Sequence, residues 1–167
     1  KLSDRIAELQ EYRNREISAL PIERGLFFCA GCPHNTSTKV PEGSRAYAGI
    51  GCHTMVVFMD RQTNAYTHMG AEGSNWIGES KFSKTHHVFQ NLGDGTYNHS
   101  GILAMRAAVA SNTTITYKLL YNDAVALTGG QPMDGEVDVY RIANEITAIG
   151  VEKLVFVGDE LSRINTG

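Results

Sequence analysis

Residues 87–95 read His-Val-Phe-Gln-Asn-Leu-Gly-Asp-Gly, an apolar stretch that runs into a carboxylate flanked by two glycines. The pattern predicts a strand over residues 86–92 and a helix that begins at about Thr96. A helix N-terminus presents free N–H groups and the positive end of the helix dipole, so it attracts phosphate. Asp94 beside that phosphate would offer the hard oxygen ligand that Mg²⁺ prefers. Taken alone, however, Gly-Asp-Gly is also typical of an ordinary turn.

A second predicted strand, over residues 114–121, ends at Asn122 and Asp123. If the two strands are parallel neighbours, these ends meet at one edge of the sheet, where open α/β sheets bind ligands. Residues 128–131, Thr-Gly-Gly-Gln, then form a glycine-rich loop that suits close backbone approach. Together the two strand ends predict a metal-bridged diphosphate site.

The rest of the chain continues the alternation of strands and helices. Alternating elements predict right-handed βαβ units, and so an α/β fold with a parallel sheet and helices on both faces. We expect two units, an N-terminal helix and linker over residues 1–23 and a binding domain over residues 24–167. The further predicted elements are helices over 2–17, 96–110 and 137–149, a linker at Pro21, strands over 45–50, 65–69 and 153–157, and a loop over 70–78.

Composition describes an ordinary globular chain. The 167 residues are 42% hydrophobic and 20% charged with a net charge of -3, which gives no reason to expect nucleic-acid binding. No apolar run approaches the roughly 20 residues that span a bilayer, so we expect a cytoplasmic protein with no membrane partner. Because the sequence begins at Lys1 rather than Met, we expect it to be part of a longer chain.

Three cysteines stand as a Cys-x-x-Cys pair, Cys29 and Cys32, plus Cys52. An odd number with this spacing is not typical of a secreted disulfide framework. His34 and His53 lie close to them in sequence, so the spacing alone leaves open a zinc site, an iron–sulfur cluster or unliganded thiols.

The Gly-Asp-Gly triplet followed by an asparagine-bearing loop resembles the signature of thiamine-diphosphate enzymes. The Thr-Gly-Gly-Gln loop is similar to that of the 2-oxoacid:ferredoxin oxidoreductases. Residues 28–35, 49–53 and 91–97 resemble the indolepyruvate branch of that family, and the resemblance extends over roughly residues 24–160. It implies a thiamine-diphosphate-binding fold.

The resemblance also implies roles for individual residues. Mg²⁺ would be held by Asp94, Asn122 and the backbone carbonyl of Ala124, and the diphosphate would meet Gly93, Gly95 and Thr96. His34 lies where the family loop contacts the cofactor, although a loop histidine bonded to backbone is an alternative. Cys52 would lie near the cofactor, and Cys29, Cys32 and Cys52 match ligands of a 4Fe–4S cluster whose fourth cysteine lies further along the family chain.

Some other residues stay open at this point. The sequence does not show which way the His53 side chain points. His99 lies either near phosphate or in solvent. His68, Trp76 and the glycines around Glu72 would line a substrate pocket or belong to the core.

The implied activity is oxidative decarboxylation of a 2-oxoacid. In this family thiamine diphosphate serves as the electron sink, iron–sulfur clusters carry electrons to ferredoxin, and coenzyme A takes the acyl group. Leu127 stands where the pyruvate branch has asparagine, which favours aryl pyruvates such as indolepyruvate. The glutamate that activates the cofactor would come from another domain or subunit, in an assembly that we expect to be dimeric.

Two other classes fit parts of the sequence. A non-redox thiamine-diphosphate decarboxylase would not need the three cysteines. A zinc-stabilised binding module would not need the pairing of Gly-Asp-Gly with Asn122.

Overall fold

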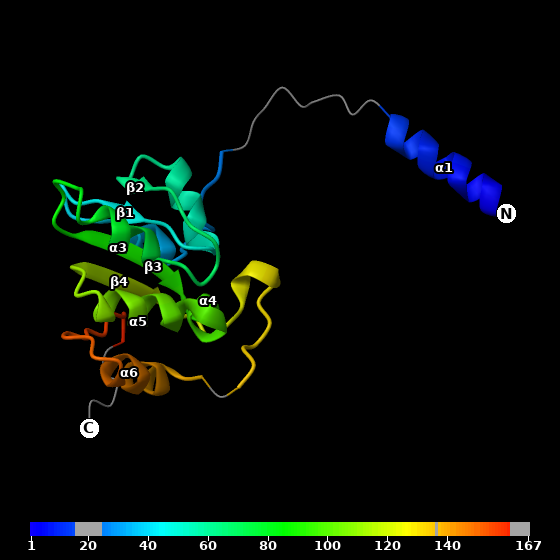
Figure 1. Ribbon diagram of the computed structural model, residues 1–167. Coiled ribbons are helices and arrows are strands. Elements are labelled where there is room, and N and C mark those ends of the chain that lie inside the picture. The colour runs from blue at the N-terminus through cyan, green and yellow to red at the C-terminus, as the bar shows by residue number, and fades with distance from the viewer. Residues whose placement is uncertain (16–24, 136, 161–167) are drawn as a thin grey trace.

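A parallel four-stranded sheet forms the centre of the computed structural model, which describes residues 1–15, 25–135 and 137–160. Its spatial order is β2-β1-β3-β4 (Figure 1). The long central pair, β3 and β4, is in register from Val88 opposite Ile115 to Gly93 opposite Leu120. The strands are β1 (Ala46–Tyr47), β2 (Thr63–Asn64), β3 (Val88–Gly93) and β4 (Ile115–Leu120). The predicted α/β class with a parallel sheet is confirmed.

Helices cover both faces of this sheet, as the alternation predicted. One face carries α3 (Ser74–Glu79), α5 (Ile102–Ala110) and α6 (Val139–Ala148), which pack on the side of Val88 and Leu92. The other face carries α2 (His34–Ser37) and a 3₁₀ helix, η1 (Cys52–Phe58). A further short 3₁₀ helix, η3 (Ala126–Thr128), lies in the loop after β4.

The main core fills the space between the sheet, α5 and α6. Its buried side chains come from the end of β3, the following helix and one face of α6, where isoleucines recur at the helical spacing. Asp138 caps α6 by accepting a hydrogen bond from the Arg141 N–H at 2.7 Å. The buried members of this core are Leu92, Tyr97, Met105, Val137, Ile142 and Ile146.

The helical run after β3 begins at Asp94, slightly before the predicted start. It comprises α4 (Asp94–Thr96), a π-helical turn, η2 (Tyr97–Gly101), and α5. Gly101 lets this run approach the sheet, because a Cβ there would lie 2.9 Å from Leu92 Cδ1. Asp94 is therefore held at the junction of a strand and a helix that pack closely together.

Two predictions in the first half of the chain are wrong. The strand expected over residues 65–69 is β2, which lies earlier at Thr63–Asn64. The stretch over residues 70–78, predicted as a loop, contains α3. Its lone Trp76 is fully buried against Tyr47 and Val88, and its indole N–H donates to the Thr114 carbonyl at 3.0 Å. Tertiary packing of this indole outweighs the turn preference of the neighbouring glycines.

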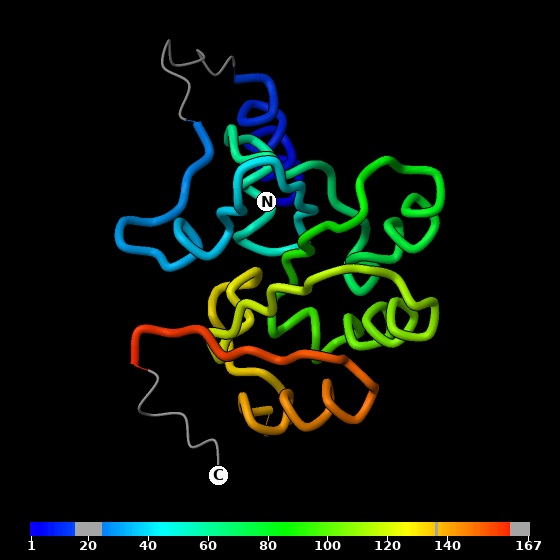
Figure 2. Tube along the Cα trace, turned by 90° about the vertical axis from the view of Figure 1, so that its left-hand side faces the viewer, coloured from blue at the N-terminus to red at the C-terminus, as the bar shows by residue number. Residues whose placement is uncertain are grey.

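The strand predicted over residues 153–157 is also not formed. Figure 2 shows this stretch as an extended trace between β4 and α6, and within the described residues it pairs with no strand. Leu154, Val155 and Val157 stay exposed, so they lack the packing that would fix a register.

The N-terminal helix α1 (Leu2–Asn14) buries none of its side chains and lies apart from the sheet (Figure 1). The predicted helix end at Ile17, the linker at Pro21 and the unit boundary at residues 23 and 24 lie outside the described residues. None of the helices in the described parts of the chain is long and apolar enough to cross a membrane.

Candidate functional site: a cofactor pocket around Asp94

Asp94 joins the two strand ends that the sequence singled out. Its carboxylate is buried, with 3% of the residue exposed. Oδ2 accepts hydrogen bonds from the backbone N–H groups of Asn122 and Asp123, both at 2.8 Å. Oδ1 accepts from the N–H of Gly95, also at 2.8 Å. The carboxylate thus fixes the loop after β4 to the start of the helix after β3.

This arrangement leaves oxygen lone pairs for a cation. A carboxylate has about four acceptor positions, and three are used here, so Oδ1 keeps one. The side-chain Oδ1 of Asn122 accepts from the Ala124 N–H at 3.2 Å and likewise keeps one. One carboxylate and neutral oxygens, completed by phosphate and water, are the ligands that Mg²⁺ commonly takes. The donor set therefore fits a magnesium diphosphate.

One pocket contains all the residues that the resemblance implied for the cofactor. They come from four separate segments of the chain, which the sheet and its loops bring together. The hydroxyl of Thr96 donates to the Ile50 carbonyl at 3.3 Å, and so joins the helix start to the loop after β1. The eight residues are His34, Cys52, Gly93, Asp94, Gly95, Thr96, Asn122 and Ala124.

The pocket also contains residues outside the eight that were predicted for the cofactor. Val125, Ala126 and Leu127 add an apolar wall from the loop after β4, and Leu120 adds the end of that strand. The loop after β1 contributes Ile50, Gly51 and His53. The glycines on either side of Ile50 were the sequence signal that could have identified this loop. They did not show which way the His53 side chain points.

Two histidine rings stack at one side of the pocket. The His34 and His53 centroids are 6.2 Å apart, with 14° between the ring planes. Burial, and to a smaller extent the neighbouring His34, together lower the pKa of His53 to about 4. Burial also lowers the pKa of His34, and the negative charge of Asp94 opposes that shift. Both rings are therefore largely neutral at pH 7.

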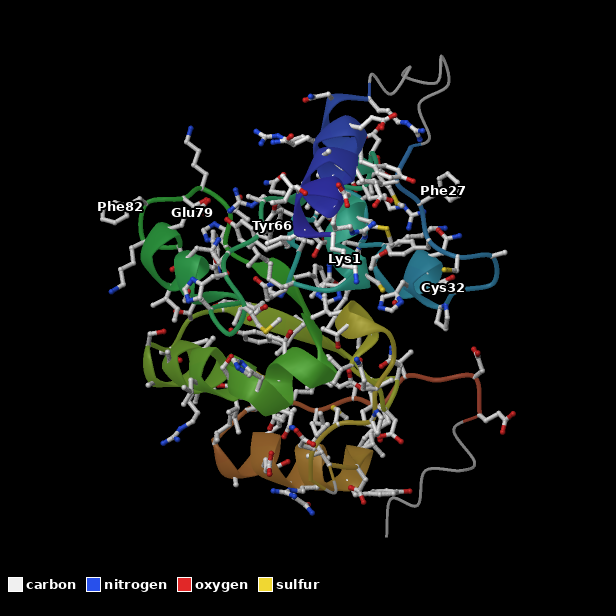
Figure 3. All side chains as sticks on the ribbon, turned by 90° about the vertical axis from the view of Figure 1, so that its right-hand side faces the viewer. Lys1, Phe27, Cys32, Tyr66, Glu79 and Phe82 are labelled. Carbon is white, nitrogen blue, oxygen red and sulfur yellow. The ribbon has the colours of Figure 1, made fainter. Side chains whose placement is uncertain are left out.

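Only some of the three cysteines lie at this pocket. The N–H of Cys32 donates to the Cys29 carbonyl at 3.1 Å, and this turn carries Cys32 to within 3.1 Å of His34 Nδ1, measured from Sγ. Figure 3 shows Cys32 close to α2. Cys52 lines the pocket, whereas Cys29 is exposed and does not. Across the described residues, no three His, Cys, Asp or Glu side chains converge as ligands of one metal ion.

The three thiols are therefore not assembled into a zinc or cluster site in this structure, and they are fewer than the four thiolates that a 4Fe–4S cluster usually takes. Their assignment as cluster ligands stays a prediction.

The other residues that the sequence left open lie in the core or on the surface. Trp76 belongs to the core, and His68 and His99 are exposed. Glu72 is buried and accepts from the N–H groups of Ile50 at 3.3 Å and Gly70 at 2.7 Å. Glu72 therefore supports the loop after β1 from beneath the pocket.

The fold and the pocket define a class of protein: a parallel α/β domain whose strand ends surround a carboxylate beside a helix start. Residues 49–154 match the family described as thiamine pyrophosphate enzyme, C-terminal TPP binding domain. The match covers well over half of the chain, which therefore belongs to this family.

Curated relatives narrow the comparison. The chain is similar to the indolepyruvate oxidoreductase subunit IorA of Methanothermobacter thermautotrophicus, with 27% identity over 86% of this chain and 25% of the relative. For the subunit IorA of Methanothermobacter marburgensis the identity is 28%, over 83% of this chain and 24% of the relative. For the subunit IorA of Thermococcus kodakarensis the identity is 28%, over 77% of this chain and 23% of the relative. The chain spans about a quarter of the length of these relatives.

Proposed function

We propose that this chain is the cofactor domain of a thiamine-diphosphate-dependent 2-oxoacid oxidoreductase of the indolepyruvate type. The observation that carries the proposal is the set of hydrogen bonds around Asp94, which ties two strand ends into one pocket. Family membership and the similarity to subunits IorA support it. Residues 24–167 would form the cofactor unit of a longer chain, and residues 1–23 its N-terminal helix and linker.

Within this proposal, each residue of the predicted cofactor set has a defined task. Asp94, Asn122 and the carbonyl of Ala124 hold Mg²⁺, and Gly93, Gly95 and Thr96 meet the diphosphate. When bound, thiamine diphosphate supplies the electron sink for decarboxylation of a 2-oxoacid. His34 and Cys52 lie beside the cofactor, and Val125, Ala126 and Leu127 form an apolar wall next to it.

We further propose that the substrate is an aryl pyruvate such as indolepyruvate. Leu127 lines the pocket and is 43% exposed, so its side chain is available to an incoming ring. Apolar surface there favours an indole over the methyl group of pyruvate, because burying apolar area is favourable.

The intact enzyme would bind a 4Fe–4S cluster through Cys29, Cys32 and Cys52, with a fourth ligand from elsewhere, and would use ferredoxin and coenzyme A. In the described part of this structure the three thiols do not converge on one position. Other domains or subunits, in a dimeric assembly, would supply the glutamate that activates the cofactor.

The test is a turnover assay on the full-length protein together with its partner subunits. Oxidation of indolepyruvate by an artificial electron acceptor should require both thiamine diphosphate and coenzyme A. Release of CO₂ without any acceptor would instead indicate a non-redox decarboxylase. Zinc in place of iron, with no response to thiamine diphosphate, would indicate a zinc-stabilised binding module.

A further inference from the structure

His53 is the buried side chain of the pocket wall that the proposed function leaves without a task. It is 2% exposed, and its Nε2 has no hydrogen-bond partner among the described residues. Burying an unpaired ring nitrogen costs free energy, and an aliphatic side chain would avoid that cost. We therefore expect the imidazole at this position to have a role that an aliphatic side chain could not fill.

Three glycines make the space that this ring occupies. A Cβ on Gly51 would lie 2.6 Å from His53 Cε1, and a Cβ on Gly49 would lie 2.7 Å from Nε2. A Cβ on Gly93 would lie 3.4 Å from Cε1. At Gly51 the backbone is extended, so it is space and not conformation that requires glycine there. This space, the slot of Gly49, Gly51 and Gly93, connects the loop after β1 to the end of β3, next to Asp94.

His34 stacks against the His53 ring. The rings of Phe28, His34 and His53 form a continuous stack, with centroids 5.6 Å apart for the first pair and 6.2 Å for the second. Cys32 Sγ lies 3.1 Å from His34 Nδ1, which leaves Nε2 of that ring for a ligand. The orientation of His34 is thus set by two stacked rings, Phe28 and His53, and by one contact at its edge with Cys32.

We propose that His53 is a positioning residue: held in the slot of Gly49, Gly51 and Gly93, it fixes the His34 ring toward the bound thiamine diphosphate. The proposal rests on the proposed function, since His34 is taken to contact the cofactor. His53 itself acts only through His34. Its loss should therefore matter only while His34 is present.

A double-mutant cycle on the full-length protein tests this, with the dissociation constant of magnesium thiamine diphosphate from calorimetry as the readout. His53→Ala and His34→Ala should each weaken binding roughly three- to ten-fold, the range expected for one stacked ring contact. The double variant should bind no more weakly than His34→Ala alone. His86→Ala, which removes an exposed histidine, is the matched control and should bind like the parent.

A second variant keeps the test valid if His53→Ala fails to fold. Gly51→Ala presses on His53, because the three atoms nearest to the added Cβ all belong to the His53 ring. It should weaken binding about as much as His53→Ala, and should have no further effect in the His34→Ala background. Gly78→Ala, where an added Cβ meets nothing within 4 Å, is its control.

The outcomes separate the two proposals. If the parent protein does not bind thiamine diphosphate at all, the proposed function fails. If the parent binds but His53→Ala or Gly51→Ala leaves the affinity unchanged, or weakens it equally with and without His34, the positioning role is refuted.

Discussion

Asp94 and Asn122, 28 residues apart in the chain, meet through a 2.8 Å hydrogen bond from the Asn122 backbone N–H to Asp94 Oδ2. The bond depends on parallel pairing of β3 with β4, which places Gly93 opposite Leu120 and so brings both strand ends to one edge of the sheet. A carboxylate in this position both closes the loop after β4 and presents an oxygen to the pocket. The same residue therefore has a structural and a proposed metal-binding role.

The structural role predicts a loss of stability in Asp94→Ala. Three backbone N–H groups would lose their acceptor, and each unpaired buried group costs about 1–3 kcal/mol, less where water enters. We expect a decrease of about 2–4 kcal/mol in the free energy of unfolding, whereas Asn122→Ala keeps its N–H and should cost under about 1 kcal/mol. Urea unfolding of the 167-residue chain, followed by the fluorescence of its single Trp76, measures both. Equal costs for the two variants would contradict this account.

A second prediction concerns the thiols. Cys29→Ser, Cys32→Ser and Cys52→Ser in the full-length protein should each reduce cluster iron while the domain stays folded, because a thiolate ligand is replaced by a poorer one. Iron and acid-labile sulfide per protein after anaerobic purification give the readout. Stoichiometric zinc without iron in the parent would disprove the cluster assignment.

The strand ends and the helix start were predictable because they depend on local sequence. The apolar stretch over residues 86–92 and the β-branched and aromatic run over residues 114–121 predicted β3 and β4, and the Gly-Asp-Gly break predicted a helix start at about Thr96, two residues after the observed start at Asp94. The eight residues predicted for the cofactor could be named from the resemblance, and they all line one pocket.

Elements that depend on contacts between distant residues were not predictable. α3 carries glycines that favour a turn, and only the burial of Trp76 against β1 and β3 makes it a helix. The stretch over residues 153–157 has the composition of a strand, but nothing along the chain signals that it stays unpaired. The slot of His53 depends on Gly49 and Gly93, which are 44 positions apart, and neighbouring sequence does not reveal that they meet.

Leu127→Asn should reduce the preference of the enzyme for aryl pyruvates over pyruvate. The substitution removes apolar surface from the pocket wall and offers a hydrogen bond that a small polar substrate can use, which is worth about 1–2 kcal/mol, or roughly ten-fold in relative kcat/KM. The comparison is kcat/KM for indolepyruvate and for pyruvate, with coenzyme A and an artificial acceptor. A parent enzyme that prefers pyruvate would contradict the assignment to the indolepyruvate type.

His53 predicts how stability depends on pH. Its pKa is about 4 when folded and near 6.5 when unfolded, so the unfolded chain binds the extra proton below pH 6.5. The stability that neutral His53 provides is present above pH 6.5 and is lost as the pH falls toward 4, by about 2 kcal/mol between pH 7 and 5. His53→Gln, which does not titrate, should lose that much less over the same range in urea unfolding. Parallel pH profiles for the two proteins would show that His53 is not held neutral.

The central claim, that a pocket organised by Asp94 binds magnesium thiamine diphosphate, is tested most directly by calorimetric titration of the full-length protein with the cofactor. The parent should bind with Mg²⁺ present and lose binding in EDTA. Asp94→Asn, which keeps the size of the side chain but removes its charge, should abolish detectable binding, Asn122→Ala should weaken it less, and the surface control Asp134→Asn should bind like the parent. Unchanged affinity in a folded Asp94→Asn protein would contradict the account.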